Sequence, residues 1–299
     1  MSTSLITAIT SIIMAMFTFF SSIIGIIESK PDTTVVQGFE QKSEDALRVM
    51  SFNIRCTNVG SASWEDRIGI VSQTMLDSEA DSIGVQEATP EWMATLKNTV
   101  FEKYAYVGVA RDDGANEGEY SAIFYLKDKY DVIDSGTFWL SKTPEKPSLG
   151  WDAACKRICT WVHLKDKESG EEYVHMNSHF DHIGIAAREN SVKMILEKAK
   201  TFTDLPVVFT ADMNVKEGSD NYNQFTQSDY FYDTKHLAPD TMDYCTYHDT
   251  KPQKHKDDVI DYVMVNNKFE ALSYKVVTEG IDGEYVSDHF PIYADIRIK

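Results

Sequence analysis

Six short β-type runs, each ending in a polar side chain that can bind a metal ion or a phosphate, constrain this chain most strongly. Apolar runs of this length form buried strands, and a carboxylate, amide or imidazole at or just past the end of a strand lies at the rim of the sheet. Six such strand ends indicate one shared site. The runs are RVMSFN (48–53), SIGVQE (82–87), YVHMNSHFDH (173–182), VVFTADMN (207–214), DVIDYVMV (258–265) and YVSDHFPIY (285–293).

Strands and helices alternate along the chain from residue 47. The strand at 48–53 is followed by apolar residues at helical spacing over 68–76 and by a strand at 82–86, which is one β-α-β unit. A second helix is predicted at 185–200. Few helices for so many strands favours two mixed sheets packed face to face with helices outside, an α/β sandwich. Further strands are predicted at 104–109, 120–126, 131–139, 157–164, 172–178, 206–211, 258–265, 272–277 and 291–298.

The first 46 residues differ from the rest. The stretch 6–27 carries no charged side chain and is long enough to cross a bilayer as a helix. No Lys or Arg precedes it and no clear cleavage motif follows it, so a membrane anchor is favoured over a cleaved signal peptide. We predict an export segment at 1–27, a polar linker at 28–46 and one α/β domain at 47–299. The chain is then expected outside the cell, or anchored facing outside.

Composition excludes some partners. A net charge of −18 argues against a protein that grips duplex DNA through a basic surface. An acidic chain that handles phosphates needs cations to bridge like charges, although the charge also suits a secreted protein that only has to stay soluble. We expect a monomer. The four cysteines, which fit neither a disulfide framework nor a zinc site, are interpreted as structural thiols: Cys56, Cys155, Cys159 and Cys245.

Residue type alone already suggests chemistry at the strand ends. Glu87 follows an apolar strand and is a candidate metal carboxylate, or else a surface Glu that begins a loop. Asp212 and Asn214 are two apart, so in an extended segment they point the same way, although an Asx turn gives the same pattern. His179 and His289 are candidate acid/base groups, or packed core histidines. Each signal is weak when taken alone.

Taken together, six segments resemble the endonuclease/exonuclease/phosphatase superfamily, which has the DNase I-like fold. They occur in the family's order and spacing over residues 47–299: MSFNIR, GVQEA, NSHFDH, TADMN, IDYVMV and SDHFPI. Three more stretches resemble a bacterial branch of metal-dependent hydrolases related to deadenylase-like members: GEYSAIFY (118–125), DSGTFWLS (134–141) and GWDAACKRICTW (150–161). The resemblance implies a four-layer α/β sandwich and a catalytic domain at 47–299.

The resemblance also implies roles for single residues. Asp212 would activate the attacking water, Asn214 would contact a phosphoryl oxygen, and Asp261 would orient His289 against the scissile phosphate. The implied metal ligands for Mg²⁺, or Mn²⁺ in its place, are Glu87, Asp288 and Asn53. The implied catalytic set is His179, Asp212, Asn214, Asp261 and His289, and the implied substrate contacts are Asn53, Arg157, Trp151 and His182. A structural role for Arg157 and a core-packing role for Trp151 remain alternatives.

Three functions follow in order of preference. The first is a Mg²⁺-dependent phosphoesterase that hydrolyses a phosphodiester, such as a nucleotide or single-stranded nucleic acid, by in-line attack of water. The second is a phosphatase or phospholipase-like enzyme acting on sugar, inositol or lipid phosphates, which a membrane-bound N-terminal segment would favour. The third, a binding module without catalysis, is disfavoured because every matched catalytic residue type is retained.

Overall fold

Two β-sheets packed face to face form the centre of the structure, a computed structural model that describes residues 38–280 and 284–299. The first sheet has seven strands in the order β10-β12-β13-β1-β2-β4-β3, and the second has six in the order β5-β6-β7-β8-β11-β9. The first sheet contains β1 (Leu47–Asn53), β2 (Ser82–Ala88), β3 (Tyr104–Val107), β4 (Tyr120–Leu126), β10 (Asp240–Thr241), β12 (Phe269–Val276) and β13 (Ile292–Ile298). The second contains β5 (Tyr130–Trp139), β6 (Ile158–Asp166), β7 (Glu172–His179), β8 (Val207–Asp212), β9 (Tyr232–Asp233) and β11 (Asp261–Val265).

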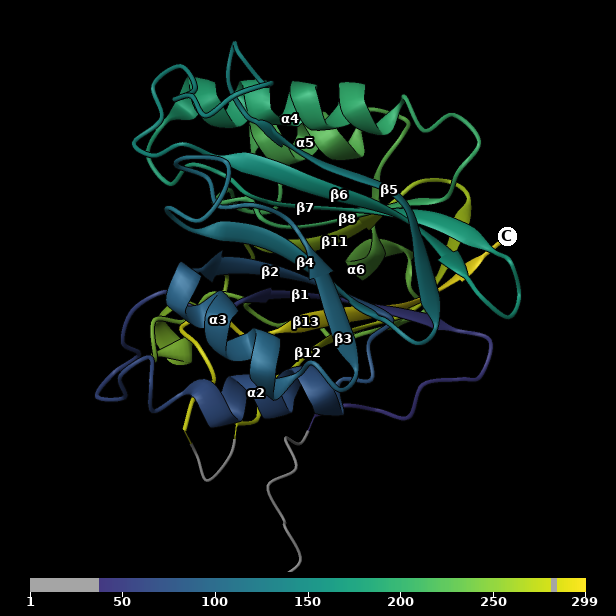
Figure 1. Ribbon diagram of the computed structural model, residues 1–299, viewed down its shortest axis with the longest axis horizontal. Coiled ribbons are helices and arrows are strands. Elements are labelled where there is room, and N and C mark those ends of the chain that lie inside the picture. The colour runs from purple at the N-terminus through teal and green to yellow at the C-terminus, as the bar shows by residue number, and fades with distance from the viewer. Residues whose placement is uncertain (1–37, 281–283) are drawn as a thin grey trace, which may run out of the picture. The chain divides into compact units, whose positions relative to one another are not determined.

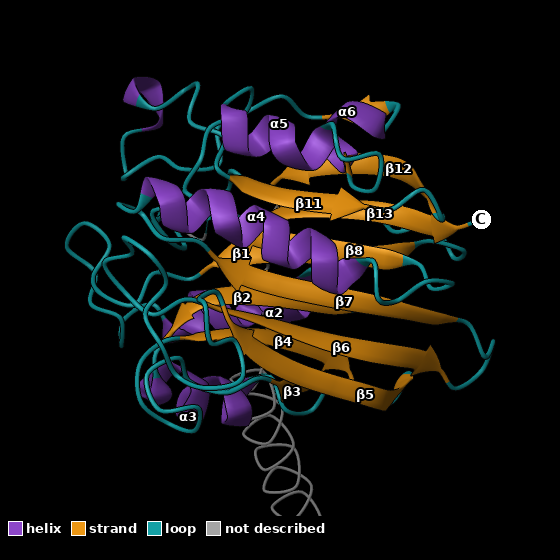
Figure 2. Cartoon of the chain, turned by 90° about the horizontal axis from the view of Figure 1, so that it is seen from above, coloured by secondary structure: helices purple, strands orange, loops and turns teal. Residues whose placement is uncertain are grey.

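Helices cover the outer faces of both sheets, which gives four layers (Figures 1 and 2). Helices α2 (Ile68–Asp77) and α3 (Pro90–Thr99) cover the seven-stranded sheet, and α4 (Ile185–Ala199) and α5 (Asp220–Thr226) cover the six-stranded sheet. A short α6 (Thr234–Leu237) and a 3₁₀ turn (Pro252–Lys254) lie in the loops. The predicted sandwich of two mixed sheets flanked by helices is confirmed.

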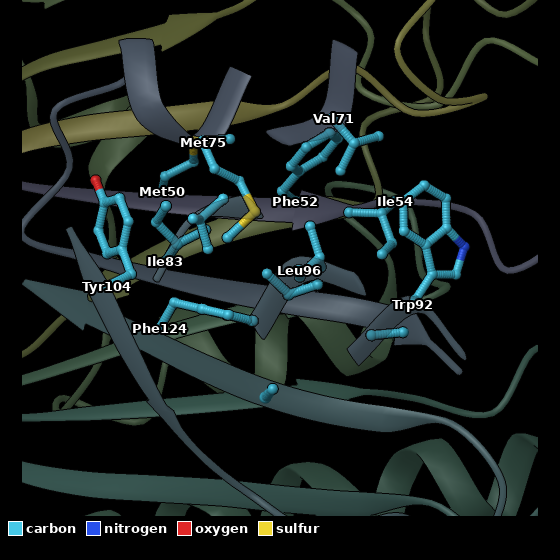
Figure 3. Packing of buried hydrophobic residues seen from close by; sticks show 14 of the residues in the cluster. Met50, Phe52, Ile54, Val71, Met75, Ile83, Trp92, Leu96, Tyr104 and Phe124 are labelled. Carbon is cyan, nitrogen blue, oxygen red and sulfur yellow. The ribbon is translucent and has the colours of Figure 1, made fainter. Parts of the chain in front are cut away.

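The apolar core under α2 and α3 follows from the periodicity of the sequence. Buried side chains of β1, β2 and β4 pack against one face of each helix (Figure 3). Helix α3 begins with Pro90 after Thr89, whose hydroxyl accepts a hydrogen bond from the backbone N–H of Trp92. Trp92 is fully buried in this core. The helix, which periodicity did not predict, is therefore defined by its cap and by one aromatic anchor.

The interface between the two sheets contains polar as well as apolar side chains. Asn177 on β7 donates hydrogen bonds to the carbonyl oxygens of Val85 and Ala122 on the opposite sheet, both at 2.9 Å, and accepts one from Gln86 at 2.7 Å. His175 contacts the hydroxyl of Ser82 on the opposite sheet through its Nδ1. Because these side chains are buried and bonded across the interface, they fix how the two sheets face each other.

Gly84 on β2 allows this close approach, and we expect Gly84→Ala to destabilise the fold by about 1–3 kcal/mol. A Cβ at this position would lie 2.6 Å from Asn177 Oδ1 and closer still to Thr210 Oγ1. Urea unfolding measures the change. Gly69→Ala on α2, where a Cβ meets nothing within 4 Å, is the matched control and should be neutral or stabilising. Equal stability of the two variants would contradict the prediction.

Residues 38–46 pack against the domain. The backbone N–H of Glu40 donates to the Tyr293 hydroxyl at 3.0 Å, and Lys42 forms an ion pair with buried Asp81 at 2.7 Å. Residues 38–46 belong to the same compact unit as the rest of the domain, so that unit takes in the end of the segment predicted as a linker. The predicted export segment at 1–27 lies outside the described residues. Within 38–280 and 284–299, no helix is long and apolar enough to cross a membrane.

Candidate active site

The strand topology brings the six polar strand ends to one edge of the sandwich. Strands β1 and β2 run parallel, as do β7 and β8, so their C-terminal ends meet at the same edge. His179 and Asp212 are register partners at the ends of β7 and β8. Asp261, at the start of antiparallel β11, pairs with Asp212 from the other side. Asp288 and His289 lie four and three residues before the start of β13, which runs antiparallel to β1.

A hydrogen-bonded trio joins the two sheets at this edge. The amide Nδ2 of Asn53 donates to Glu87 Oε1 at 3.1 Å and to Asp212 Oδ2 at 2.9 Å. Its Oδ1 accepts a hydrogen bond from the backbone N–H of Arg55 at 3.0 Å. Asn53 is buried, and in this arrangement it orients both carboxylates. Asn53 was predicted at the site, and there it donates hydrogen bonds to the two acidic side chains.

Glu87 reaches the site through an irregularity in β2. The register of β2 against β4 shifts between Val85 and Ala88, and Glu87 has a positive φ of 61°. A bulge of this kind re-aims a side chain near the end of a strand. Burial opposes ionisation of Glu87, but the N–H of Cys56 at 3.0 Å and the positive charges of His289 and Arg55 stabilise its carboxylate and hold its pKa well below the usual range. Glu87 is therefore ionised at neutral pH.

His179 and Asn214 form a second pair beside Asp212. Asn214 Nδ2 lies 3.0 Å from His179 Nε2, and the Asn214 backbone N–H donates to Asp212 Oδ1 at 2.9 Å. Burial, together with the positive charge of Arg157, lowers the pKa of His179 well below its usual value, so the ring is neutral. Its Nδ1 has no hydrogen-bond partner among the described residues. The neutral ring therefore has one nitrogen, Nδ1, that is unpaired beside the pocket in the described part of the chain.

His289 carries a positive charge. Its Nδ1 lies 2.9 Å from Asp261 Oδ2, and its Nε2 lies 3.7 Å from Asp212 Oδ2. Burial lowers the pKa of His289, but the charges of Asp261 and Asp212 outweigh burial and raise it to about 10. Burial and the Asp261 charge raise the pKa of Asp212 to about 7, against the opposing effects of His289 and Asn53. Asp212 can therefore accept a proton near neutral pH.

These residues border a pocket of about 480 Å³. Arg157, from the predicted set, lines it and is buried; its Nη2 lies 3.1 Å from His182 Nδ1, while its Nε and Nη1 have no hydrogen-bond partner among the described residues. The Nε still forms an ion pair with buried Asp181, 3.5 Å from its Oδ2, so Nη1 is the donor left to face an anionic ligand within the described part of the chain. The lining consists of Arg55, Cys56, Glu87, Arg111, Glu119, Cys155, Arg157, His179, His182, Asp212, Asn214, Tyr247, Ile260 and His289.

Trp151 does not belong to this lining within the described part of the chain. It has a positive φ of 43°, and the next residue, Asp152, accepts hydrogen bonds from the N–H groups of Ala186 and Ala187 in the first turn of α4. The loop therefore supports α4.

All four cysteines are free, and two of them, Cys56 and Cys155, line the pocket.

Several pocket residues were not predicted. Arg111 and Glu119 form a bidentate ion pair at 2.8 and 3.0 Å across the loop between β3 and β4. Tyr247 pairs with His289 in an isolated β-bridge, and the centroids of their rings lie 5.0 Å apart. Both residues lie in the charged stretch 111–119, RDDGANEGE. The sequence holds no signal for Tyr247.

The donor set suits a hard divalent cation. Glu87, His179 and Asp212 place their ligand atoms within 4.8 Å of one another, and so do Asp212, Asp261 and His289. Carboxylate oxygens prevail, which is the preference of Mg²⁺ and Mn²⁺. Protonated His289, already paired with Asp261, has no nitrogen lone pair with which to bind a metal ion. The residues present therefore fit a divalent cation held mainly by oxygen.

Comparisons with known proteins agree with this geometry. A family model described as the endonuclease/exonuclease/phosphatase family matches residues 50–289. A mannosyl-6-phosphatase of Bacteroides thetaiotaomicron is 34% identical, with 84% of this chain and 99% of that chain covered and a TM-score of 0.78. An endonuclease/exonuclease/phosphatase of Bacteroides vulgatus is 36% identical, with 85% and 99% covered and a TM-score of 0.81.

A more distant structure shares the fold alone. The catalytic domain of human Nocturnin with bound sulfate is 17% identical, with 87% of this chain and 97% of that chain covered and a TM-score of 0.68. A search of curated proteins found no match.

Proposed function

We propose that this chain, which belongs to the endonuclease/exonuclease/phosphatase family, is a Mg²⁺-dependent enzyme that hydrolyses a small phosphomonoester, with phosphorylated sugars as the substrate class. Hydrolysis of a phosphoester follows from the family. The observation that supports a small substrate is the pocket of about 480 Å³, which is bordered by the Arg111–Glu119 ion pair and suits a small molecule. The mannosyl-6-phosphatase relative supports a sugar phosphate over the phosphodiester that the sequence favoured.

The residues divide the chemistry among them. Asp212, whose pKa of about 7 is close to neutrality, takes the proton of the attacking water. His289 and the Nη1 of Arg157 stabilise negative charge on the phosphoryl oxygens, and Asp261 holds the His289 ring in place. Glu87 and Asp288 would hold the cation, with Asn53 orienting Glu87. When bound, that cation would supply further positive charge for the phosphoryl and leaving oxygens.

A substrate panel tests the proposal. The full-length chain with Mg²⁺ is assayed against a hexose 6-phosphate, nitrophenyl phosphate, bis-nitrophenyl phosphate, single-stranded RNA and a phospholipid, beside Asp212→Ala. We expect the highest kcat/KM on the hexose 6-phosphate, with release of inorganic phosphate. A higher kcat/KM on the diesters would favour the phosphodiesterase instead. Equal rates for the wild type and Asp212→Ala on every substrate would remove the catalytic assignment.

Chelation tests the dependence on a cation. Because the carboxylates at the site need a divalent cation to bind a phosphate of the same charge, we expect excess EDTA to lower kcat/KM at least about 100-fold. Added Mg²⁺ or Mn²⁺ should restore activity. The measurement is initial rate against free cation concentration. Undiminished turnover in EDTA would exclude the metal role of Glu87.

Export to the cell exterior, or anchoring there, is proposed on the apolar segment 1–27 alone. Cell fractionation with the full-length chain tests it. Recovery in the cytosol would contradict export.

A further inference from the structure

We propose that Arg55 competes with the divalent cation for the carboxylates of Glu87 and Asp288, and so sets the affinity of the site for the cation. This inference rests on the metal dependence proposed above. Arg55 is not among the site residues that were predicted from the sequence.

The position of the guanidinium carries the inference. Arg55 Nη1 lies 3.9 Å from Glu87 Oε1 and 3.5 Å from Asp288 Oδ2, so a single positively charged group bridges both carboxylates. These two residues are the ones we expect to hold the cation. A guanidinium and a cation cannot both occupy the space between them.

Arg55 is held loosely compared with its neighbour Arg67. The guanidinium of Arg67 donates four hydrogen bonds to backbone carbonyl oxygens at 2.6–2.9 Å. The Arg55 side chain makes only the two long ion pairs, its Nε has no hydrogen-bond partner among the described residues, and the side chain is 40% exposed. Its release therefore breaks no hydrogen bond in the described part of the chain.

The two carboxylates, in contrast, are fixed. Glu87 accepts hydrogen bonds from Asn53 and from the backbone N–H of Cys56, and Asp288 accepts one from Ser287. Both carboxylates are buried, so they cannot turn toward solvent when their counter-ion leaves. The site therefore holds a preorganised pair of carboxylates and an exchangeable positive partner.

The electrostatic effect is large enough to measure. Displacing a unit positive charge from a carboxylate about 4 Å away lowers the affinity for the cation at least about fivefold even where water screens the interaction. Removing the Arg55 charge should therefore tighten cation binding, whereas a residue that helps to hold the cation would weaken binding when removed.

The experiment compares the full-length wild type, stripped of metal by chelation, with Arg55→Gln, Arg55→Lys and Arg297→Gln. Arg297 is the matched control because its side chain is 41% exposed and also bridges two carboxylates, those of Asp45 and Glu270. Calorimetry gives the Kd for Mg²⁺. We expect Arg55→Gln to bind at least fivefold more tightly than the wild type, and the other two variants to stay within about twofold.

Thermal unfolding supplies a readout that is independent of activity. In EDTA, Arg55→Gln should melt below the wild type because its two carboxylates have lost their counter-ion. Saturating Mg²⁺ should then raise the Tm of Arg55→Gln more than that of the wild type. Near-ultraviolet circular dichroism in Mg²⁺ checks that the variant is folded.

The outcomes separate this inference from the proposed function. Unchanged or weaker Mg²⁺ binding by Arg55→Gln, beside a wild type that binds, would overturn the competition and leave the metal dependence intact. Equal tightening in Arg297→Gln would show a general effect of net charge and would also overturn it. No Mg²⁺ binding by the wild type would overturn both proposals.

Discussion

Replacing Asp212 by Asn is expected to lower kcat about 10³-fold, within the range that a positioned acid/base group contributes. Asn has nearly the same shape and can still accept a hydrogen bond from Asn53, but it cannot take a proton from water. KM should change little, because His289 and Arg157 still face the substrate. Steady-state kinetics on the best substrate of the panel measures both constants.

The same substitution should leave the fold intact, which separates a catalytic loss from a structural one. Burial raises the pKa of Asp212 to about 7, so the folded protein disfavours its ionised form, and a neutral amide removes that unfavourable charge. We expect an unchanged or higher Tm. Asp131→Asn, at an exposed carboxylate near Lys167, is the control and should retain full activity. A kcat within tenfold of the wild type for Asp212→Asn would refute the assignment.

Strand positions could be predicted from sequence wherever an apolar run ends at a polar residue. The strands predicted at 82–86 and 120–126 lie at Ser82–Ala88 and Tyr120–Leu126. The strand predicted at 258–265 begins only at Asp261, because Asp258 forms ion pairs with Lys216 and His255 instead of joining the sheet. An apolar pattern predicts a buried strand. It does not show whether a polar residue at the end of the strand belongs to the sheet or forms an ion pair outside it.

Helices α3 and α5 show what periodicity misses. Helix α3 has a Thr-Pro start signal at Thr89 and Pro90 but few apolar positions, and α5 reads DNYNQFT, which has weak helix propensity. In α5, Tyr222 and Phe225 are buried against the six-stranded sheet, so tertiary packing fixes a segment that would not be helical alone.

The residues of the candidate site also divide into those that the sequence predicts and those that it does not. Residues on strand ends, such as Glu87 and Asp212, could be predicted because parallel strands bring their ends to one edge. Arg111 and Arg55 reach the pocket from loops, and no pattern in the sequence gives the path of a loop. The position of Trp151 outside the pocket lining likewise depends on the conformation of its loop, which the hydrogen bonds of Asp152 to α4 determine.

Because of His175, which lies between the two sheets, we expect the protein to lose stability as the pH falls. Its Nδ1 contacts Ser82 and its Nε2 contacts Thr210, both at 2.8 Å, and the ring is fully buried. Burial lowers the pKa of His175 from 6.5 to about 3. Between those two pH values the unfolded chain therefore binds a proton that the folded protein does not, so stability rises with pH across this window.

The expected slope from this one group is about 1.4 kcal/mol per pH unit, with a total loss of up to about 5 kcal/mol between pH 6.5 and 3. Replacing His175 by Gln, which has polar groups for both hydroxyls but no proton to gain, should remove that slope while lowering stability at pH 7.5 by about 1–2 kcal/mol through poorer geometry. Urea unfolding at pH 7.5, 6.0 and 5.0 gives the free energy of unfolding of both proteins. The titration of all other groups cancels in the difference between the two values at each pH. Parallel curves for the two proteins would mean that His175 becomes protonated in the folded state, and that the sheets tolerate a charge between them.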